Sequence, residues 1–218
     1  MNNEEKLSKL LADRPTLHPR RDGSQRCIGM HSDVLLALGE QLKPGMSTLE
    51  TGCGLSTLVF ALGRCRHKAI VPNQSHIEST MESAKAYDVS LDNVTFLKGR
   101  SENILPGLDS LGHVDVILID GGHAFPIPFI DWFYAGRHLE IGGVMIVDDI
   151  DLRSVNILYD FLSSQPEWKS MQIIRRTAFF RRLDVVDHGE EWDYWQQQPF
   201  NKDLGKSIRK LWLNIRHR

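Results

Sequence analysis

Residues 50–57, Glu50-Thr-Gly-Cys-Gly-Leu-Ser-Thr57 (ETGCGLST), place two glycines directly behind a short β-prone run, STLET at 47–51. A helix is expected after them, from about residue 56 to 64. A strand, a glycine turn and a helix in this order are typical of a loop that holds a nucleotide-like cofactor. Glycine pairs also occur in turns that bind nothing, so the rest of the chain has to decide the interpretation.

Strand-like and helix-like segments alternate along the chain on both sides of this loop. Strands are expected at 47–51, 68–72, 93–99, 114–120 and 143–149, and helices at 3–12, 32–42, 56–64, 76–87, 127–139 and 152–164. MQIIRR and AFFRRL, joined through Thr177, predict a C-terminal antiparallel hairpin. The pattern predicts an α/β fold with a Rossmann-like, doubly wound, mostly parallel seven-stranded sheet and helices on both faces. Ser32 or Asp33 is expected to cap the second helix.

The chain of 218 residues is long enough for one substantial core, and no low-complexity linker divides it. We expect an N-terminal helix and connector at 1–30, a cofactor-binding domain at 31–183 and a C-terminal extension at 184–218. A net charge of -2 argues against a protein that coats nucleic acid. The charged start lacks the core of a signal peptide and no stretch is apolar for long enough to span a bilayer, so a cytoplasmic location is expected.

Three cysteines, Cys27, Cys53 and Cys65, fit no metal-binding spacing and leave one thiol out of any disulfide scheme. They are interpreted as reduced and mostly structural thiols.

Polar residues and glycines follow every expected parallel strand. In a doubly wound sheet the ligand lies across the carboxyl ends of the strands, so these residues are expected to line one crevice. They are Gly52 and Gly54, Val71 to Gln74, Gly99 to Glu102, Asp120 to His123, and Asp148 with Asp149.

The composition of the glycine loop bears on the cofactor. A dinucleotide fingerprint needs a third small residue where this chain has Thr57, which disfavours a pyrophosphate ligand. Glu50, ahead of the glycines, favours a ligand with a cationic end and would repel a phosphate. S-adenosylmethionine has such an end, with an ammonium and a sulfonium group.

E-x-G-x-G at 50–54, followed in order by NVTFLKGRSENILPGL, VDVILIDGGH and GGVMIVDDI, resembles the class I S-adenosylmethionine-dependent methyltransferases. The resemblance covers about residues 30–182 and is strongest to the metal-dependent O-methyltransferases of the catechol and macrocin types. It implies that Glu50, Gly52 and Gly54 hold the methionine part, that Ser101 contacts the adenine, and that Glu102 is its neighbour.

The chain departs from this family at two places. Val71 stands near the position where the family has an acidic residue for the ribose hydroxyls, and Asn73 or Gln74 could accept those hydrogen bonds instead. Arg100 stands where many members have an aspartate.

Three aspartates are expected at the chemical centre. Asp120, Asp148 and Asp149 follow two strands that should be neighbours, and carboxylates that converge call for a cation between them. Oxygen ligands favour Mg²⁺ or a similar ion, and the resemblance places a metal on these positions. In the alternative interpretation, Asp149 or Asp151 only caps the helix that follows.

His123 lies three residues after Asp120 on the same loop, in DGGHAF. Its pKa near neutrality suits a base that takes a proton from the acceptor hydroxyl, and the catechol-type enzymes carry a lysine base at the corresponding place. We therefore name His123 and Asp120 as catalytic candidates, with Asp120 also counted among the cofactor-binding residues. A loop histidine that only hydrogen-bonds the backbone or lies beside the metal is the alternative.

Two aromatic or basic segments allow two interpretations each. Most aromatic residues of 125–139 are expected in the core, with Phe125 as the pocket candidate. The basic amphipathic segment 201–218 would dock on its own domain or a second subunit, or lie on an anionic membrane. Residues 190–200 would form a surface turn or a lid over the substrate.

The sequence thus predicts metal-assisted O-methylation of a small hydroxylated molecule. The expected cofactors are S-adenosylmethionine and a divalent ion, for which the ligand type favours Mg²⁺. No specific nucleic-acid partner is expected, and a homo-oligomer is compatible with the sequence. Two rival functions stay open. One is a cofactor-binding regulatory protein without catalysis, which the departures at Val71 and Arg100 favour. The other is a nicotinamide-dependent oxidoreductase, against which Thr57 counts.

Overall fold

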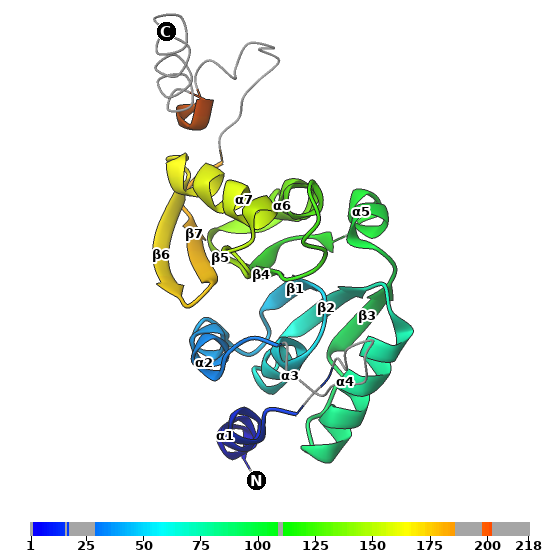
Figure 1. The fold of residues 1–218 in the computed structure, drawn as a ribbon. Coiled ribbons are helices and arrows are strands. Elements are labelled where there is room, and N and C mark those ends of the chain that lie inside the picture. The colour runs from blue at the N-terminus through cyan, green and yellow to red at the C-terminus, as the bar shows by residue number, and fades with distance from the viewer. Residues whose placement is uncertain (1, 16, 18–28, 109–110, 186–197, 202–218) are drawn as a thin grey trace, which may run out of the picture.

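The fold is built on one seven-stranded sheet (Figure 1). A computed structural model describes residues 2–15, 17, 29–108, 111–185 and 198–201. The strand order is β3-β2-β1-β4-β5-β7-β6; strands β1 to β5 pair in parallel, and β7 is antiparallel to both of its neighbours. The strands are β1 (Ser47–Thr51), β2 (Arg66–Val71), β3 (Val94–Lys98), β4 (Val114–Ile119), β5 (Leu139–Val147), β6 (Trp168–Ile174) and β7 (Thr177–Arg182).

Helices cover both faces of the sheet, as the sequence predicts. They are α1 (Asn3–Asp13), α2 (Ser32–Glu40), α3 (Leu55–Leu62), α4 (Gln74–Ala86), α5 (Ser101–Ile104), α6 (Ile127–Gly136) and α7 (Arg153–Ser164). Side chains alternate along a strand, and β4 shows the result: Val116 and Leu118 join the core under α1 to α3, whereas Ile117 and Ile119 join the core under α6 and α7. The predicted doubly wound α/β class is confirmed.

Two boundaries, the end of α6 and the beginning of β5, differ from the prediction by three residues or more. The helix expected over 127–139 ends at Gly136, because β5 already begins at Leu139, which pairs with Val114 of β4. The backbone N–H of Val114 also donates to His138 O at 2.9 Å. Residues 137–139, which their spacing assigned to the helix, therefore form the turn before β5 and its first residue. The short helix α5 was not predicted.

The expected cap of α2 is also wrong. The N-cap residue is His31, without a side-chain hydrogen bond. The Ser32 hydroxyl donates instead to Leu11 O at 3.1 Å, and Asp33 forms an ion pair with Arg175 at 2.8 Å. Both polar side chains therefore tie α2 to distant segments.

Several predicted features lie outside the described residues. These are Cys27, most of the segment expected as a turn or lid at 190–200, and the basic segment after Asn201. Within the described ranges, no helix combines the length and apolar character needed to cross a membrane.

Candidate functional site

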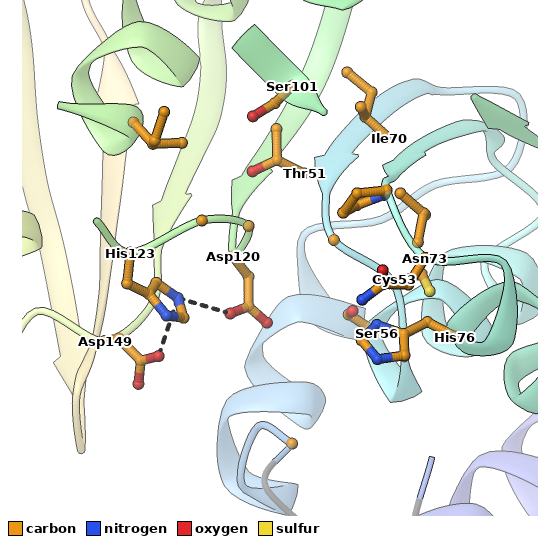
Figure 2. Close-up of a pocket in the computed structure, with 18 of the residues that line it drawn as sticks. Thr51, Cys53, Ser56, Ile70, Asn73, His76, Ser101, Asp120, His123 and Asp149 are labelled. Carbon is orange, nitrogen blue, oxygen red and sulfur yellow. Dashed lines mark ion pairs between the residues drawn. The ribbon is translucent and has the colours of Figure 1, made fainter. Parts of the chain in front are cut away.

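A cavity of about 520 Å³ opens at the carboxyl ends of the strands, between β1 and its two neighbours β2 and β4 (Figure 2). This is where the strand order reverses, the usual ligand position in a doubly wound sheet. Nearly every loop expected to line the crevice contributes to it. The lining includes Thr51 to Ser56, Ile70 to Asn73, His76, Arg100 to Glu102, Asp120 to Ala124, Ile127 and Asp149.

Gly52 makes the closest backbone approach in the site. Its φ is +100°, and a Cβ built there would lie 2.4 Å from the backbone oxygen of Asp120. Its N–H donates to Ile70 O at 2.9 Å. Only glycine fits this conformation and this space, so the ETGCGLST loop packs directly against the loop that carries Asp120.

Glu50 is hydrogen-bonded to residues that follow the glycine loop, and it is not among the residues that line the cavity. Its side chain is 1% exposed and accepts hydrogen bonds from Ser56 Oγ at 2.7 Å and from Thr57 Oγ1. His67 Nε2 lies 3.0 Å from the same carboxylate. Thr57 in turn accepts from the Gly54 N–H at 2.9 Å. Glu50 thus orders the glycine loop through Ser56 and Thr57, and its expected role in holding the methionine part of a ligand stays a prediction.

The wall formed by β2 and α4 has no carboxylate among the residues that line the cavity, although the resemblance leads us to expect one there. Val71 is buried at the end of β2, while Asn73 and His76 line the cavity. Gln74 instead donates to Glu78 at 3.2 Å. His76 was missed in the sequence because nothing local distinguishes it; it reaches the cavity because α4 begins at the strand end.

Ser101 and Glu102 line the cavity from α5, and Arg100, beside them, pairs with Glu102 at 3.4 Å. The cavity wall also contains Cys53, whose sulfur accepts from Thr80 Oγ1 at 3.5 Å. Burial raises the pKa of this thiol to about 12. Cys53 and Cys65 are free thiols, as the sequence predicts.

The N-terminal segment closes another part of the cavity. Pro15, Leu17, Gly29 and Met30 line it, and the Arg14 guanidinium donates to Gly29 O at 3.4 Å and to Met30 O at 3.2 Å. The sequence identified this stretch only as a connector, because its Pro, Gly and Arg content carries no sign of the contact.

Asp120, His123 and Asp149 form the polar centre of the cavity (Figure 2). One possible ligand atom from each lies within 4.8 Å of the others. His123 Nε2 is 3.1 Å from Asp149 Oδ2 and 3.7 Å from Asp120 Oδ1. Arg176 Nε contacts the other Asp149 oxygen at 2.7 Å.

These neighbours shift two pKa values upward. The Asp120 carboxylate, followed by the charge of Asp149, raises the pKa of His123 against the opposing effect of burial. Burial, together with the nearby charges of Asp148 and Asp149, raises the pKa of Asp120 to about 7, although His123 opposes the shift. Asp120 is therefore expected to titrate close to neutral pH.

Asp148 lies apart from this group among the described residues. Its side chain is 3% exposed, and Asp148 Oδ1 accepts a hydrogen bond from Thr177 Oγ1 on β7. Consecutive residues at a strand end point in different directions, and the φ of +59° at Asp149 turns that residue toward the cavity. His123 thus stands where the sequence placed the third carboxylate.

The capping interpretation does not describe Asp149. The N-cap of α7 is Leu152, and it receives no side-chain hydrogen bond. The Asp149 side chain is engaged by His123 and Arg176 instead. Two carboxylates and an imidazole are donors that fit a divalent ion, so the residues present are compatible with the metal that the resemblance implies.

Asp131 of α6 is a buried carboxylate that the sequence analysis missed, although a charge inside the apolar run FPIPFIDWFYAG was a usable signal. Its side chain is fully buried. Among the described residues, no donor makes a hydrogen bond of good geometry to either carboxylate oxygen, although the hydroxyls of Ser101 and Thr51 lie nearby. Burial raises the pKa of Asp131 to about 6, and the hydroxyls of Ser101 and Thr51 offset this only in part.

Replacing Asp131 with asparagine is expected to stabilise the protein above pH 6. An aspartate with a pKa of about 3.9 when unfolded and about 6 when folded costs stability as the pH rises through that window, up to about 3 kcal/mol. Urea unfolding at pH 4.5 and pH 8 would measure it: the variant should gain about 3 kcal/mol at pH 8 and only about 1 kcal/mol at pH 4.5. Asp160→Asn, on the exposed face of α7, is the control; parallel pH profiles for wild type and Asp131→Asn would contradict the assignment.

The aromatic segment divides between core and surface. Phe129 and Trp132 pack with Phe161 in the core cluster, as expected. Phe125 is 68% exposed, and its ring packs edge to face against Phe129 with 6.4 Å between the ring centroids. It follows the catalytic loop but is not among the residues that line the cavity.

Comparison with known proteins agrees with this fold. Residues 49–150 match a family described as a methyltransferase domain. No curated protein matches the chain. Similar solved structures include the O-methyltransferase TomG from Streptomyces achromogenes in complex with SAM, with 19% identity, a TM-score of 0.64, and coverage of 81% of this chain and 90% of TomG.

Two further structures are similar over comparable lengths. Cofactor-bound Rv0187 from MTB is 20% identical with a TM-score of 0.62, covering 83% of this chain and 91% of that one. The SAH-bound methyltransferase PaMTH1 from Podospora anserina is 19% identical with a TM-score of 0.61, covering 83% and 88%. The resemblance to class I methyltransferases is confirmed at the level of the fold, and residues 49–150 match the methyltransferase domain.

Proposed function

Because the chain carries a methyltransferase domain within the class I methyltransferase fold, we propose that it is an S-adenosylmethionine-dependent O-methyltransferase of a small hydroxylated molecule. The observation that carries this proposal is that one cavity is lined both by the glycine loop and by the Asp120, His123 and Asp149 cluster. A methyl donor and a hydroxyl acceptor could therefore meet in the same space.

The cofactor would lie along the β1 and β2 side of the cavity. Gly52 and Gly54 leave room for its methionine part, Asn73 and His76 offer hydrogen bonds to the ribose, and Ser101 lies at the adenine side. TomG was solved with SAM and PaMTH1 with SAH, which supports the choice of cofactor. The neutral Asn73 should hold the ribose less strongly than a carboxylate would.

The acceptor would lie against the polar cluster. His123 takes the hydroxyl proton, and Asp120 and Asp149 stabilise the imidazolium that forms. The acceptor oxygen then donates an electron pair to the methyl carbon, and the carbon–sulfur bond breaks with its electrons moving to sulfur. The products are the methyl ether, S-adenosylhomocysteine and a proton held on His123.

The same cluster offers ligands for a divalent ion. Asp120 and Asp149 would hold Mg²⁺ or a similar ion, with His123 beside them. When bound, such an ion would lower the pKa of the acceptor hydroxyl and orient its oxygen.

Calorimetric titration with S-adenosylmethionine, S-adenosylhomocysteine and NAD, each with and without Mg²⁺, is the first test. We expect saturable binding of both adenosyl ligands and none of NAD. Transfer of labelled methyl from S-adenosylmethionine to a panel of phenols, catechols and sugars would then define the acceptor. NAD binding without adenosyl binding would overturn the proposal. S-adenosylmethionine binding without transfer to any acceptor would favour a non-catalytic regulatory protein.

A further inference from the structure

Arg176 lies in the turn between β6 and β7 and contacts Asp149 of the polar cluster. Its Nε lies 2.7 Å from Asp149 Oδ1, while His123 Nε2 lies 3.1 Å from Asp149 Oδ2. Both oxygens of a carboxylate that could bind a metal are therefore already in contact with nitrogen groups of the protein. The Asp149 side chain is 13% exposed and the Arg176 side chain 34%, so the pair is screened only in part.

The backbone fixes Arg176 in this place. The Ile150 N–H, next to Asp149, donates to the backbone oxygen of Arg176 at 2.9 Å. The preceding residue, Arg175, is tied to Asp33 of α2 at 2.8 Å, and Thr177 donates to Asp148. Arg175 is thus bound to α2, and Arg176 and Thr177 are bound to the residues that follow β5. These contacts fix the position of Arg176 beside the cluster.

We propose that Arg176 is the resident counter-ion of Asp149 and weakens the binding of a divalent ion at the Asp120, His123 and Asp149 cluster. The inference rests on the proposed function, in which these residues hold the ion. A divalent ion bound to Asp149 would share that carboxylate with a guanidinium of the same sign of charge. The ion must therefore either displace the Arg176 contact or tolerate its repulsion.

Charge balance explains what the pair does before a metal binds. Asp120, Asp148 and Asp149 bring three carboxylates to adjacent strand ends, and Arg176 supplies a permanent positive charge beside them. The carboxylates can therefore stay close together without a bound ion. A higher concentration of a divalent ion is then needed to occupy the site than would be needed without Arg176. Even with water-like screening, removing this charge should tighten divalent-ion binding about tenfold.

The test is direct titration of the full-length protein with Mn²⁺, followed by calorimetry and by the electron paramagnetic resonance signal of free Mn²⁺. Arg176→Gln should bind Mn²⁺ about tenfold more tightly than wild type. Arg176→Lys keeps the charge and should stay within about threefold of wild type. Arg175→Gln is the matched control, because it removes the same charge from the neighbouring residue, whose partner is Asp33.

Equal or weaker Mn²⁺ binding by Arg176→Gln would overturn the proposal. So would an equal gain in Arg175→Gln, which would indicate a general effect of net charge, or a lack of Mn²⁺ binding by every variant. Arg176→Ala serves as a second neutral variant if the glutamine variant unfolds at a lower temperature. S-adenosylmethionine affinity is measured in the same samples: its absence in wild type would count against the methyltransferase itself, whereas unchanged Mn²⁺ binding with normal cofactor binding would reject only the role of Arg176.

Discussion

Gly52→Ala is expected to destabilise the protein by about 2 to 5 kcal/mol and to remove measurable S-adenosylmethionine binding. The left-handed conformation at this position costs a non-glycine residue about 1 to 2 kcal/mol. The new Cβ would also lie 2.4 Å from the Asp120 oxygen, and relieving such overpacking costs about 1 to 3 kcal/mol. Relief requires the glycine loop and the Asp120 loop to move apart, which changes both the cofactor wall and the catalytic cluster. Urea unfolding and calorimetric titration would measure the two effects.

Gly45→Ala is the matched control for this change. Gly45 has a φ of +85°, and nothing lies within 4 Å of a Cβ placed there. An alanine at this position therefore has only the conformational cost of a positive φ and no steric clash. Gly45 is also not among the residues that line the cavity. We expect a loss of about 1 to 2 kcal/mol with cofactor affinity unchanged. Equal losses in the two variants would show that the contact with Asp120 is not what requires glycine at position 52.

Asp149→Asn is expected to lower methyl transfer by about 100- to 1,000-fold while changing S-adenosylmethionine affinity less than about threefold. Asp149 contacts His123 and faces the cavity, so its charge acts on the reacting hydroxyl. The cofactor would lie on the opposite side, along β1 and β2. Single-turnover transfer and calorimetric titration would separate the two quantities.

Asp148→Asn, the neighbouring change, tests which of the two aspartates acts. Asp148 is buried with Thr177, and the amide oxygen of asparagine can still accept that hydrogen bond. We expect transfer to fall less than about tenfold, because Asp148 is not in the ligand-forming group among the described residues. A larger loss in Asp148→Asn than in Asp149→Asn would restore the sequence-based assignment of Asp148 as the ligand.

The alternation of strands and helices was sufficient to predict the sheet, because the spacing of apolar residues within each short segment distinguishes strands from helices. The beginning of β5 was not, since LEIGG contains a glycine pair that is typical of a break. Leu139 becomes part of the strand because Val114, some 25 residues earlier, offers it a partner. Pairing between distant segments therefore decides what local propensity leaves open.

The site was predictable where it depends on strand ends. Asp120, His123 and Asp149 follow the strands that lie beside the reversal of strand order, so their convergence could be expected. Arg176 and the N-terminal wall could not be predicted. Arg176 reaches Asp149 from a hairpin turn, and the wall comes from a connector; local patterns place neither segment. The separation of Asp148 from Asp149 depends on a single backbone angle at the strand end.

Cys53 in the cavity wall has a consequence for the fate of the methyl group. A thiolate is a far better nucleophile than a hydroxyl, and one beside a sulfonium would be alkylated by the cofactor. Burial raises the pKa of Cys53 to about 12, so this thiol stays protonated at neutral pH. If S-adenosylmethionine binds here as proposed, the thiol will therefore not compete with the acceptor for its methyl group.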